Sequence, residues 1–300
     1  MKIYLFSLLA CILLIGNSCC EKPDQSLTQL QKDIVQKLGE SSGTFAIAYK
    51  DLSDSTVYIF HNKSEVFHAA STMKTPVLFE VYKQAQLGNF TLSDSLLIKN
   101  EFYSIVDSSL FRLDLKDDSD EILYNKIGKK ASIHELSYEM IIRSSNLATN
   151  LIIELVDAKN VTRSMRDIGA KKINVLRGVE DIKAYELGMS NTTTAFDLML
   201  LFENLGNYTL VDSSSSAEMI SILLDQQFND IIPAKLPENI KVAHKTGSIT
   251  KIMHDSGLVI LPDGRKYVLV LLSKDWDSKE KAKEIMADIS KMIYDYTVME

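Results

Sequence analysis

Apolar residues recur at helical spacing near both ends of the chain, which predicts an amphipathic helix at each end. The first stripe lies in residues 25–38 and consists of Leu27, Leu30, Ile34, Val35 and Leu38. The second follows Ser278, which can cap a helix, and consists of Ala282, Ile285, Met286, Ile289, Met292, Ile293 and Tyr296.

Short runs rich in β-branched and aromatic residues predict strands next to both helices. Near the start they span residues 44–49 and 56–60, which are joined by a polar turn at residues 51–55. Near the end they span residues 241–245, 255–261 and 266–273. The last two are joined by Pro262-Asp263-Gly264-Arg265, a sequence typical of a hairpin turn.

The segment between the two groups of strands is mainly helical in pattern. Pro76 lies early in one predicted helix, where its missing N–H matters little. The clearest of the others span residues 133–142, 148–156 and 194–205. This order predicts an α/β fold with an antiparallel sheet built from both chain ends, flanked by helices, plus an inserted all-helical domain. We expect residues 19–70 and 210–300 to form the α/β domain and residues 71–209 the helical domain.

Residues 1–18 have the form of a secretory signal peptide. Lys2 precedes an apolar run that is too short to span a bilayer comfortably, and small polar residues then precede Cys19 and Cys20. A cysteine in this place resembles a bacterial lipoprotein signal. We expect lipidation at Cys19, with Cys20 as the fallback, and an exported lipoprotein that is anchored in the membrane, in the periplasm or on the cell surface of a bacterium. The alternative is a plain signal peptide with incidental cysteines.

Composition restricts the partners. The chain has 300 residues, of which 46% are hydrophobic and 24% charged, which suits a large globular core. The formal charge is −7 and no dense Lys/Arg run occurs, which argues against a nucleic-acid partner. The three cysteines all lie within residues 1–20, so the folded part has neither a disulfide nor a Cys/His metal site. We expect a monomer without metal or cofactor.

Ser71 and Lys74 are the first candidates for chemistry. Residues three apart on a helix share a face, so the amine can reach the hydroxyl. A serine is a poor nucleophile until a base takes its proton, and a lysine can be that base only if burial or a neighbouring cation lowers its pKa. The same spacing recurs from Ser248 and Ser278, but only the Ser71 copy opens an amphipathic helix.

Two more polar clusters complete a candidate site. Lys245-Thr246-Gly247-Ser248 lies on a predicted strand, whose N–H groups can bind a substrate carbonyl and whose Gly247 allows close approach. Lys245 adds a positive charge that would attract a carboxylate and lower the pKa of a nearby lysine. Ser144 and Asn146 lie between two predicted helices and supply a hydroxyl and an amide.

In the order S-x-x-K, S-x-N and K-T-G, these clusters resemble class A β-lactamases and the related penicillin-binding serine enzymes over nearly all of the mature chain. The resemblance implies acyl transfer with Ser71 as nucleophile and Lys74 as its base. It also implies that Ser144 relays the proton to the leaving nitrogen, and that Asn146 binds Lys74 and the side-chain amide of the substrate.

The resemblance assigns substrate binding to the K-T-G strand. Lys245, Thr246 and Ser248 would hold the substrate carboxylate, and the N–H groups of Ser71 and Ser248 would bind the oxyanion. The implied substrate is a β-lactam or a peptidoglycan-like amide.

The loop before Asn191 departs from the family pattern. Class A enzymes carry E-x-x-L-N there, and its Glu activates the water that frees the enzyme. Here Glu180 is the candidate base, with Asp181 and Glu186 as rivals. The alternative is that these carboxylates are solvated charges or pair with nearby cations. Arg177 and Asn191 could pin the loop, although Asn cannot form the salt bridge that an Asp would.

The function depends on this loop. A placed base predicts β-lactamase-type hydrolysis. Without one, the acyl-enzyme would persist, as in a D-Ala-D-Ala peptidase or another small-amide or ester hydrolase. A non-catalytic envelope lipoprotein is the third possibility, but it would have no need for Lys74 one turn from Ser71.

Other polar and aromatic residues carry weaker signals. Phe102-Tyr103 fits either the mouth of the site or the core. His68, His244 and His254 lack a metal-binding spacing and are expected to be structural.

Overall fold

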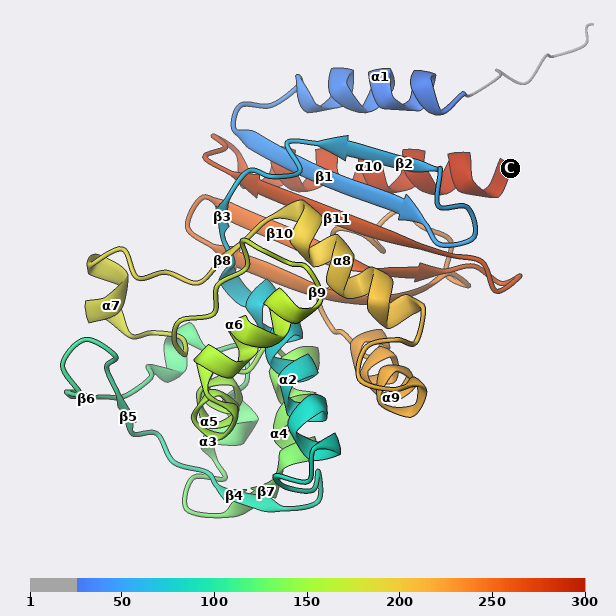
Figure 1. Cartoon of the computed structure of the whole chain (residues 1–300). Helices are drawn as coiled ribbons and strands as arrows, with labels where there is room; N and C mark the ends of the chain where they lie inside the picture. Colours follow the sequence, from blue (N-terminus) through green and yellow to red (C-terminus); the bar gives the residue numbers. More distant parts are fainter. Residues whose placement is uncertain (1–25, 300) are drawn as a thin grey trace, which may run out of the picture.

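The computed structural model describes residues 26–299, so the predicted signal peptide and Cys19 lie outside the described residues. A five-stranded sheet lies between layers of helices (Figure 1), in the order β2-β1-β11-β10-β9. Its strands are β1 (Thr44–Asp51), β2 (Tyr58–His61), β9 (Lys241–Ile249), β10 (Ile252–Ile260) and β11 (Lys266–Lys274). Every neighbouring pair is antiparallel, so the predicted sheet from both chain ends is confirmed.

The two terminal helices, α1 (Leu27–Leu38) and α10 (Lys279–Met299), cover one face of the sheet side by side (Figure 1). Ser26 caps α1, and Ser278 Oγ accepts the N–H of Lys281 at the start of α10 as expected. Apart from Val35, which is exposed, the predicted apolar stripes pack against the sheet face that carries Ile47 and Leu269. Burial of these stripes, rather than helix propensity alone, stabilises this layer.

The opposite face of the sheet meets the helical block. α8 (Ala195–Gly206) lies across β1 and β11, and its apolar residues join one continuous core with Ala48 and Val270. Residues 71–209 therefore contribute a helix to the face of the sheet. The other helices are α2 (Lys74–Gln86), α3 (Glu121–Tyr124), α4 (Ile133–Ile142), α5 (Asn146–Val156), α6 (Ala158–Asp167), α7 (Ile182–Glu186) and α9 (Ser213–Leu224).

Three short strand pairs fix the loops around this block. They are β3 (Phe67–His68) with β8 (Thr192–Thr193), β4 (Ser95–Leu97) with β7 (Lys130–Ser132), and β5 (Phe102–Tyr103) with β6 (Leu110–Phe111). The β3–β8 pair places the residues that precede Ser71 beside the end of the loop that ends at Asn191.

β9 and β10 extend beyond their predicted ranges around the K-T-G segment. We expected strands at residues 241–245 and 255–261, whereas β9 continues to Ile249 and β10 begins at Ile252. Thr246, Gly247 and Ser248 have little strand propensity of their own, but their pairing with β10 holds them in the sheet. The K-T-G segment is therefore an extended strand edge.

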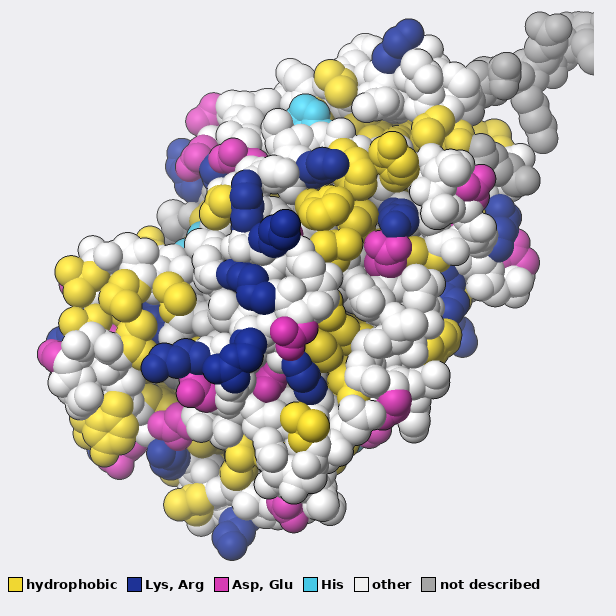
Figure 2. Space-filling model, viewed as in Figure 1, with side chains coloured by type: hydrophobic (Ala, Val, Ile, Leu, Met, Phe, Trp, Pro, Cys, Tyr) yellow, Lys and Arg dark blue, Asp and Glu magenta, His cyan; other side chains and the backbone are white. Residues whose placement is uncertain are grey.

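The surface carries mixed charges and several groups of apolar side chains. Lys and Arg side chains gather across the middle of the face in Figure 2, with Asp and Glu among them. Hydrophobic side chains gather at the left, over β5, β6 and α7, where Tyr103, Ile182 and Leu187 are exposed. Within residues 26–299, no helix has the length and apolarity needed to cross a bilayer.

Candidate active site

Ser71 lies in a strained turn at the start of α2. It belongs to a 3₁₀ segment, Ala70–Met73, that leads directly into the helix. Ala70 has φ 44°, in the left-handed region that a residue with a side chain rarely adopts. Its N–H donates to Nδ1 of His68 at 3.0 Å, and the N–H of Ala69 donates to the carbonyl of Asn191 at 2.8 Å. Strain held in this way is typical of functional sites.

Lys74 is fully buried, and its ammonium is surrounded by oxygen atoms. Nζ donates to the carbonyl of Ser144 at 2.6 Å, to Ser144 Oγ at 3.1 Å and to Asn146 Oδ1 at 3.0 Å. We expected the amine to reach Ser71, but no hydrogen bond among the described residues joins these two side chains. The ammonium instead donates its three hydrogen bonds to acceptors in the turn at residues 144–146.

Burial is the main reason that Lys74 can serve as a base. Removal from water lowers its pKa to about 7, while the charges of Asp118 and Glu180 oppose this shift. We expected burial or the neighbouring cation Lys245 to lower this pKa, and burial is the largest cause. Lys245 is itself fully buried, and its pKa is lowered first by burial and then by the charge of Lys74.

The turn that carries Ser144 is fixed by a carboxylate to which no sequence pattern pointed. Asp118 accepts the N–H of Asn146 at 3.0 Å and that of Leu147 at 2.9 Å, at the N-terminus of α5. Ser145 caps the same helix, and Ser144 has φ 58°. The acidic stretch around Asp118 gave no signal that could distinguish this capping residue from its acidic neighbours.

β9 passes close to Ser71, as we expected from the glycine at position 247. A Cβ on Gly247 would lie 3.1 Å from the backbone nitrogen atoms of Ser71 and Thr72, closer than most side chains tolerate. The strand edge and the backbone N–H of Ser71 therefore face the same space. An oxyanion placed there would have preorganised donors.

A cleft of about 330 Å³ opens at this junction. Of the predicted site residues, it is lined by Ser71, Ser144, Asn146, Thr246, Gly247 and Ser248. Lys74 and Lys245 lie buried outside this lining. Lys245 Nζ donates one hydrogen bond, to the carbonyl of Thr246 at 3.1 Å, and that Lys245 holds the substrate carboxylate stays a prediction.

Of the three acidic candidates in the loop, Glu180 is the one that contacts a residue of the site, Asn146. Its Oε1 accepts from Asn146 Nδ2 at 2.8 Å and its Oε2 accepts the N–H of Asp114 at 3.2 Å. Burial raises its pKa, and these two hydrogen bonds oppose the shift. Asp181 instead binds Ser104 and caps α7, and Glu186 is exposed. The side-chain amide of Asn146 binds both Glu180 and Lys74, and so connects the two.

Arg177 and Asn191 pin the loop through backbone hydrogen bonds. Asn191 Oδ1 accepts the N–H of Leu176 at 2.8 Å, and its Nδ2 donates to the carbonyl of Arg177 at 3.0 Å. Asn150 holds the next turn, and a Cβ on Gly178 would lie 2.2 Å from its Oδ1. Only glycine at position 178 allows this contact, which sets the position of Glu180 two residues later.

Phe102 and Tyr103 lie away from the Ser71 cleft, whereas His254 lines it. Phe102 is buried and Tyr103 exposed, and both line a separate cavity beside α5 and α6. His254 Nε2 donates to the carbonyl of His68 at 2.9 Å and its Nδ1 accepts the N–H of Ser273 at 3.2 Å, which fits a neutral ring. Burial lowers the pKa of His254 to about 4. In the part of the chain described, no group of His, Cys, Asp and Glu is arranged to hold a metal ion.

Comparisons with known proteins give the family and the fold of the chain. A family model described as the beta-lactamase enzyme family matches residues 29–297. A curated beta-lactamase from Bacteroides uniformis is 24% identical over 284 residues, which cover 90% of this chain and 92% of the relative. The structure of PBP-A is 25% identical with a TM-score of 0.78, covering 93% of this chain and 99% of that one. A variant of PBP-A, solved as an acyl-enzyme with penicillin G, is 26% identical, also with a TM-score of 0.78, over 93% and 100% of the chains.

Proposed function

Because the chain belongs to the beta-lactamase enzyme family, we propose that it is a serine hydrolase that opens the β-lactam amide through an acyl-enzyme on Ser71. One observation carries this proposal. A fully buried lysine, with its pKa lowered to about 7, lies one turn after a serine at the floor of a cleft. A protein that only binds its ligand has no need to bury a base beside a hydroxyl.

The acylation step uses the residues of the cleft. Ser71 Oγ attacks the amide carbon while neutral Lys74 takes its proton, and the oxyanion forms beside the backbone N–H groups of Ser71 and Ser248. Lys74 then passes a proton through Ser144 Oγ, 3.1 Å from Nζ, to the nitrogen atom that leaves as the C–N bond breaks. Asn146 orients Lys74 through its Oδ1.

Deacylation uses the loop. Glu180 takes a proton from a water molecule, the resulting hydroxide attacks the ester carbon, and Ser71 leaves with a proton. Burial raises the pKa of Glu180, which makes the carboxylate a stronger base than one in solution. Its contact with Asn146 supports a place beside the acylated serine.

A second candidate is a penicillin-binding enzyme of the D-Ala-D-Ala peptidase type, or another small-amide hydrolase, with slow deacylation. It is favoured by the missing E-x-x-L-N motif and by the likeness to PBP-A, of which a variant was solved as the penicillin G acyl-enzyme. Both candidates share the acylation step. They differ only in how long the acyl-enzyme lives.

A time course with a fluorescent penicillin separates these functions. Rapid gain and rapid loss of label supports the β-lactamase, and lasting label supports the second candidate. A folded protein that takes no label contradicts both and leaves a different substrate or a non-catalytic envelope lipoprotein.

The pH dependence of acylation tests the role of Lys74. The base must be neutral, so the rate constant should reach a plateau above the pKa of about 7 and fall below it. We expect a fall of about tenfold for each pH unit below the pKa, measured by stopped-flow labelling. Circular dichroism over the same range controls for unfolding, and Lys74→Arg, which stays protonated, should be inactive throughout. A rate that does not change across this range would exclude Lys74 as the base.

We also propose that the protein is exported and anchored by a lipid on Cys19, although residues 1–25 lie outside the described structure. Metabolic labelling with palmitate in a bacterial host should mark the wild type and Cys20→Ala, and leave Cys19→Ala unlabelled. The Cys20 variant is the matched control, because it changes the same residue type one position later. Label that persists in Cys19→Ala but disappears in Cys20→Ala would move the anchor to the second cysteine.

A further inference from the structure

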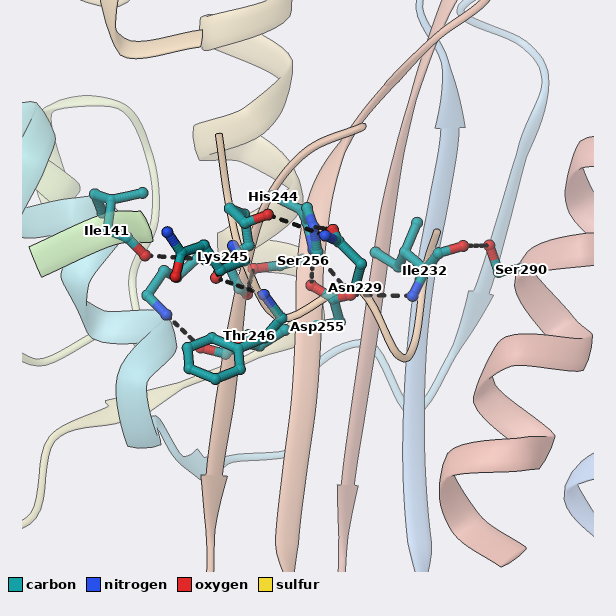
Figure 3. Close-up of polar contacts among 12 residues, drawn as sticks. Ile141, Asn229, Ile232, His244, Lys245, Thr246, Asp255, Ser256 and Ser290 are labelled. Atoms are coloured by element: carbon teal, nitrogen blue, oxygen red, sulfur yellow. Dashed lines mark hydrogen bonds and ion pairs between the residues drawn. The ribbon is translucent and has the colours of Figure 1, made fainter. Parts of the chain in front are cut away.

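The proposed mechanism leaves unused a buried ion pair next to the K-T-G segment. His244 on β9 and Asp255 on β10 are both fully buried (Figure 3). Nδ1 of His244 donates to the two carboxylate oxygens of Asp255 at 2.8 and 3.1 Å. A buried pair of this kind is costly unless all of its polar atoms are used.

The second ring nitrogen of His244 reaches a loop. Its Nε2 lies 3.0 Å from Oδ1 of Asn229. The orientation of this amide is fixed, because its Nδ2 donates to the carbonyl of Gln226 at 3.1 Å. Both ring nitrogens of His244 therefore face acceptor oxygens, to which each can donate a hydrogen bond.

We call that loop, residues 226–232, the wall loop because Phe228, Asp230 and Ile231 line the Ser71 cleft. Asn229 ties its middle to His244. At its end, the N–H of Ile232 donates to Asp255 Oδ2 at 3.0 Å (Figure 3). The ion pair therefore binds the wall loop at two points. One is Asn229, between the lining residues, and the other is Ile232, directly after them.

The pair also lies next to the residues that bind substrate. His244 directly precedes Lys245, and Asp255 lies opposite Thr246 in the register of β9 and β10. A Cβ on Gly257 would lie 2.5 Å from the Cβ of His244, so the absence of a side chain at 257 allows the two strands to pack at this point.

We propose that Asn229 and the His244–Asp255 pair form a clasp that holds the wall loop against β9, and that His244 is a positioning residue for substrate binding. This role in binding rests on the proposed function, because it concerns substrate in the Ser71 cleft. Whether the clasp holds the wall loop can be tested without substrate.

The experiment compares Asn229→Ala with Asn229→Asp in the full chain. The alanine removes the acceptor for the ring, so the wall loop should loosen. The concentration for half-maximal acylation by a β-lactam should rise about tenfold with little change in the maximal rate, because a hydrogen bond to a charged group is worth this much. Hydrogen exchange of the amides in residues 227–232 should become faster.

Asn229→Asp distinguishes the clasp from a purely structural amide. Its carboxylate can still accept a hydrogen bond from Nε2 of His244 but cannot donate to Gln226, so it should restore both the half-maximal concentration and slow exchange. Thr297→Val is the control: it removes a buried hydrogen bond to the carbonyl of Ile293, 2.8 Å long, near the end of α10 and away from the wall loop. It should leave both readouts at wild-type values.

Two outcomes would overturn the proposal. If Asn229→Asp behaves like Asn229→Ala, the ring does not donate to position 229. If Asn229→Ala leaves both exchange and acylation unchanged, the clasp does not hold the loop. A second variant, His244→Gln, should accelerate exchange at Ile232 as well. Should the wild type take no penicillin label, the proposed function fails, while the exchange measurements still decide on the clasp.

Discussion

Alanine in place of Ser71 is expected to abolish both penicillin labelling and β-lactam hydrolysis. The hydroxyl is the atom that becomes acylated, and the oxygen atoms around Lys74 cannot replace it because they are engaged with its ammonium. Loss of a nucleophilic serine typically lowers turnover by about 10⁵- to 10⁶-fold. Labelling by a fluorescent penicillin and spectrophotometric β-lactam hydrolysis measure the two effects.

Ser278 provides a matched control, since it also precedes a lysine by three residues. Ser278→Ala removes the cap of α10 and should lower stability by about 1 kcal/mol while it leaves labelling intact. If Ser71→Ala still takes up label that survives denaturation, the nucleophile lies elsewhere and the proposed mechanism is wrong.

The substitution Glu180→Gln is expected to leave acylation intact and prolong the acyl-enzyme. The new amide retains an oxygen that can accept from Asn146 but cannot remove a proton from water. A general base contributes about 10²- to 10⁴-fold, so the label should persist longer by a factor in that range. Label decay after removal of free penicillin gives the lifetime directly.

Glu186→Gln is the control for this experiment, because Glu186 is an exposed carboxylate of the same loop. Its label should decay at the wild-type rate. Equal decay in Glu180→Gln and the wild type would remove Glu180 from deacylation. If the wild-type label already persists, the second candidate function gains support.

Local patterns predicted most of the architecture. The apolar stripes of α1 and α10 and the turn around Gly264 are set by residues close in sequence, so their periodicity and turn chemistry are readable. The order of the elements then restricted the fold to a sheet made from both chain ends.

The sequence predicted which residues belong to the candidate site, but not the contacts that these residues make. Ser71, Ser144 and Gly247 line one cleft, as three separate motifs suggested. The cause of the low pKa of Lys74 is burial by the surrounding fold, which no local pattern encodes. Asp118 and Asn229 act through contacts with distant segments, so they look in the sequence like ordinary polar loop residues.

The position of β1 in the sheet has a consequence for how the molecule is made. Thr44 pairs with Lys274, so a strand synthesised early has to wait for β11, near the end of synthesis, before one of its sides is covered. Until then β1 and β2 form only an isolated hairpin with an open edge, the kind of edge that invites pairing with another chain. A ribosome that stalls before β11 emerges would therefore release a fragment prone to aggregation, and holding factors that shield strand edges should raise the yield of native protein.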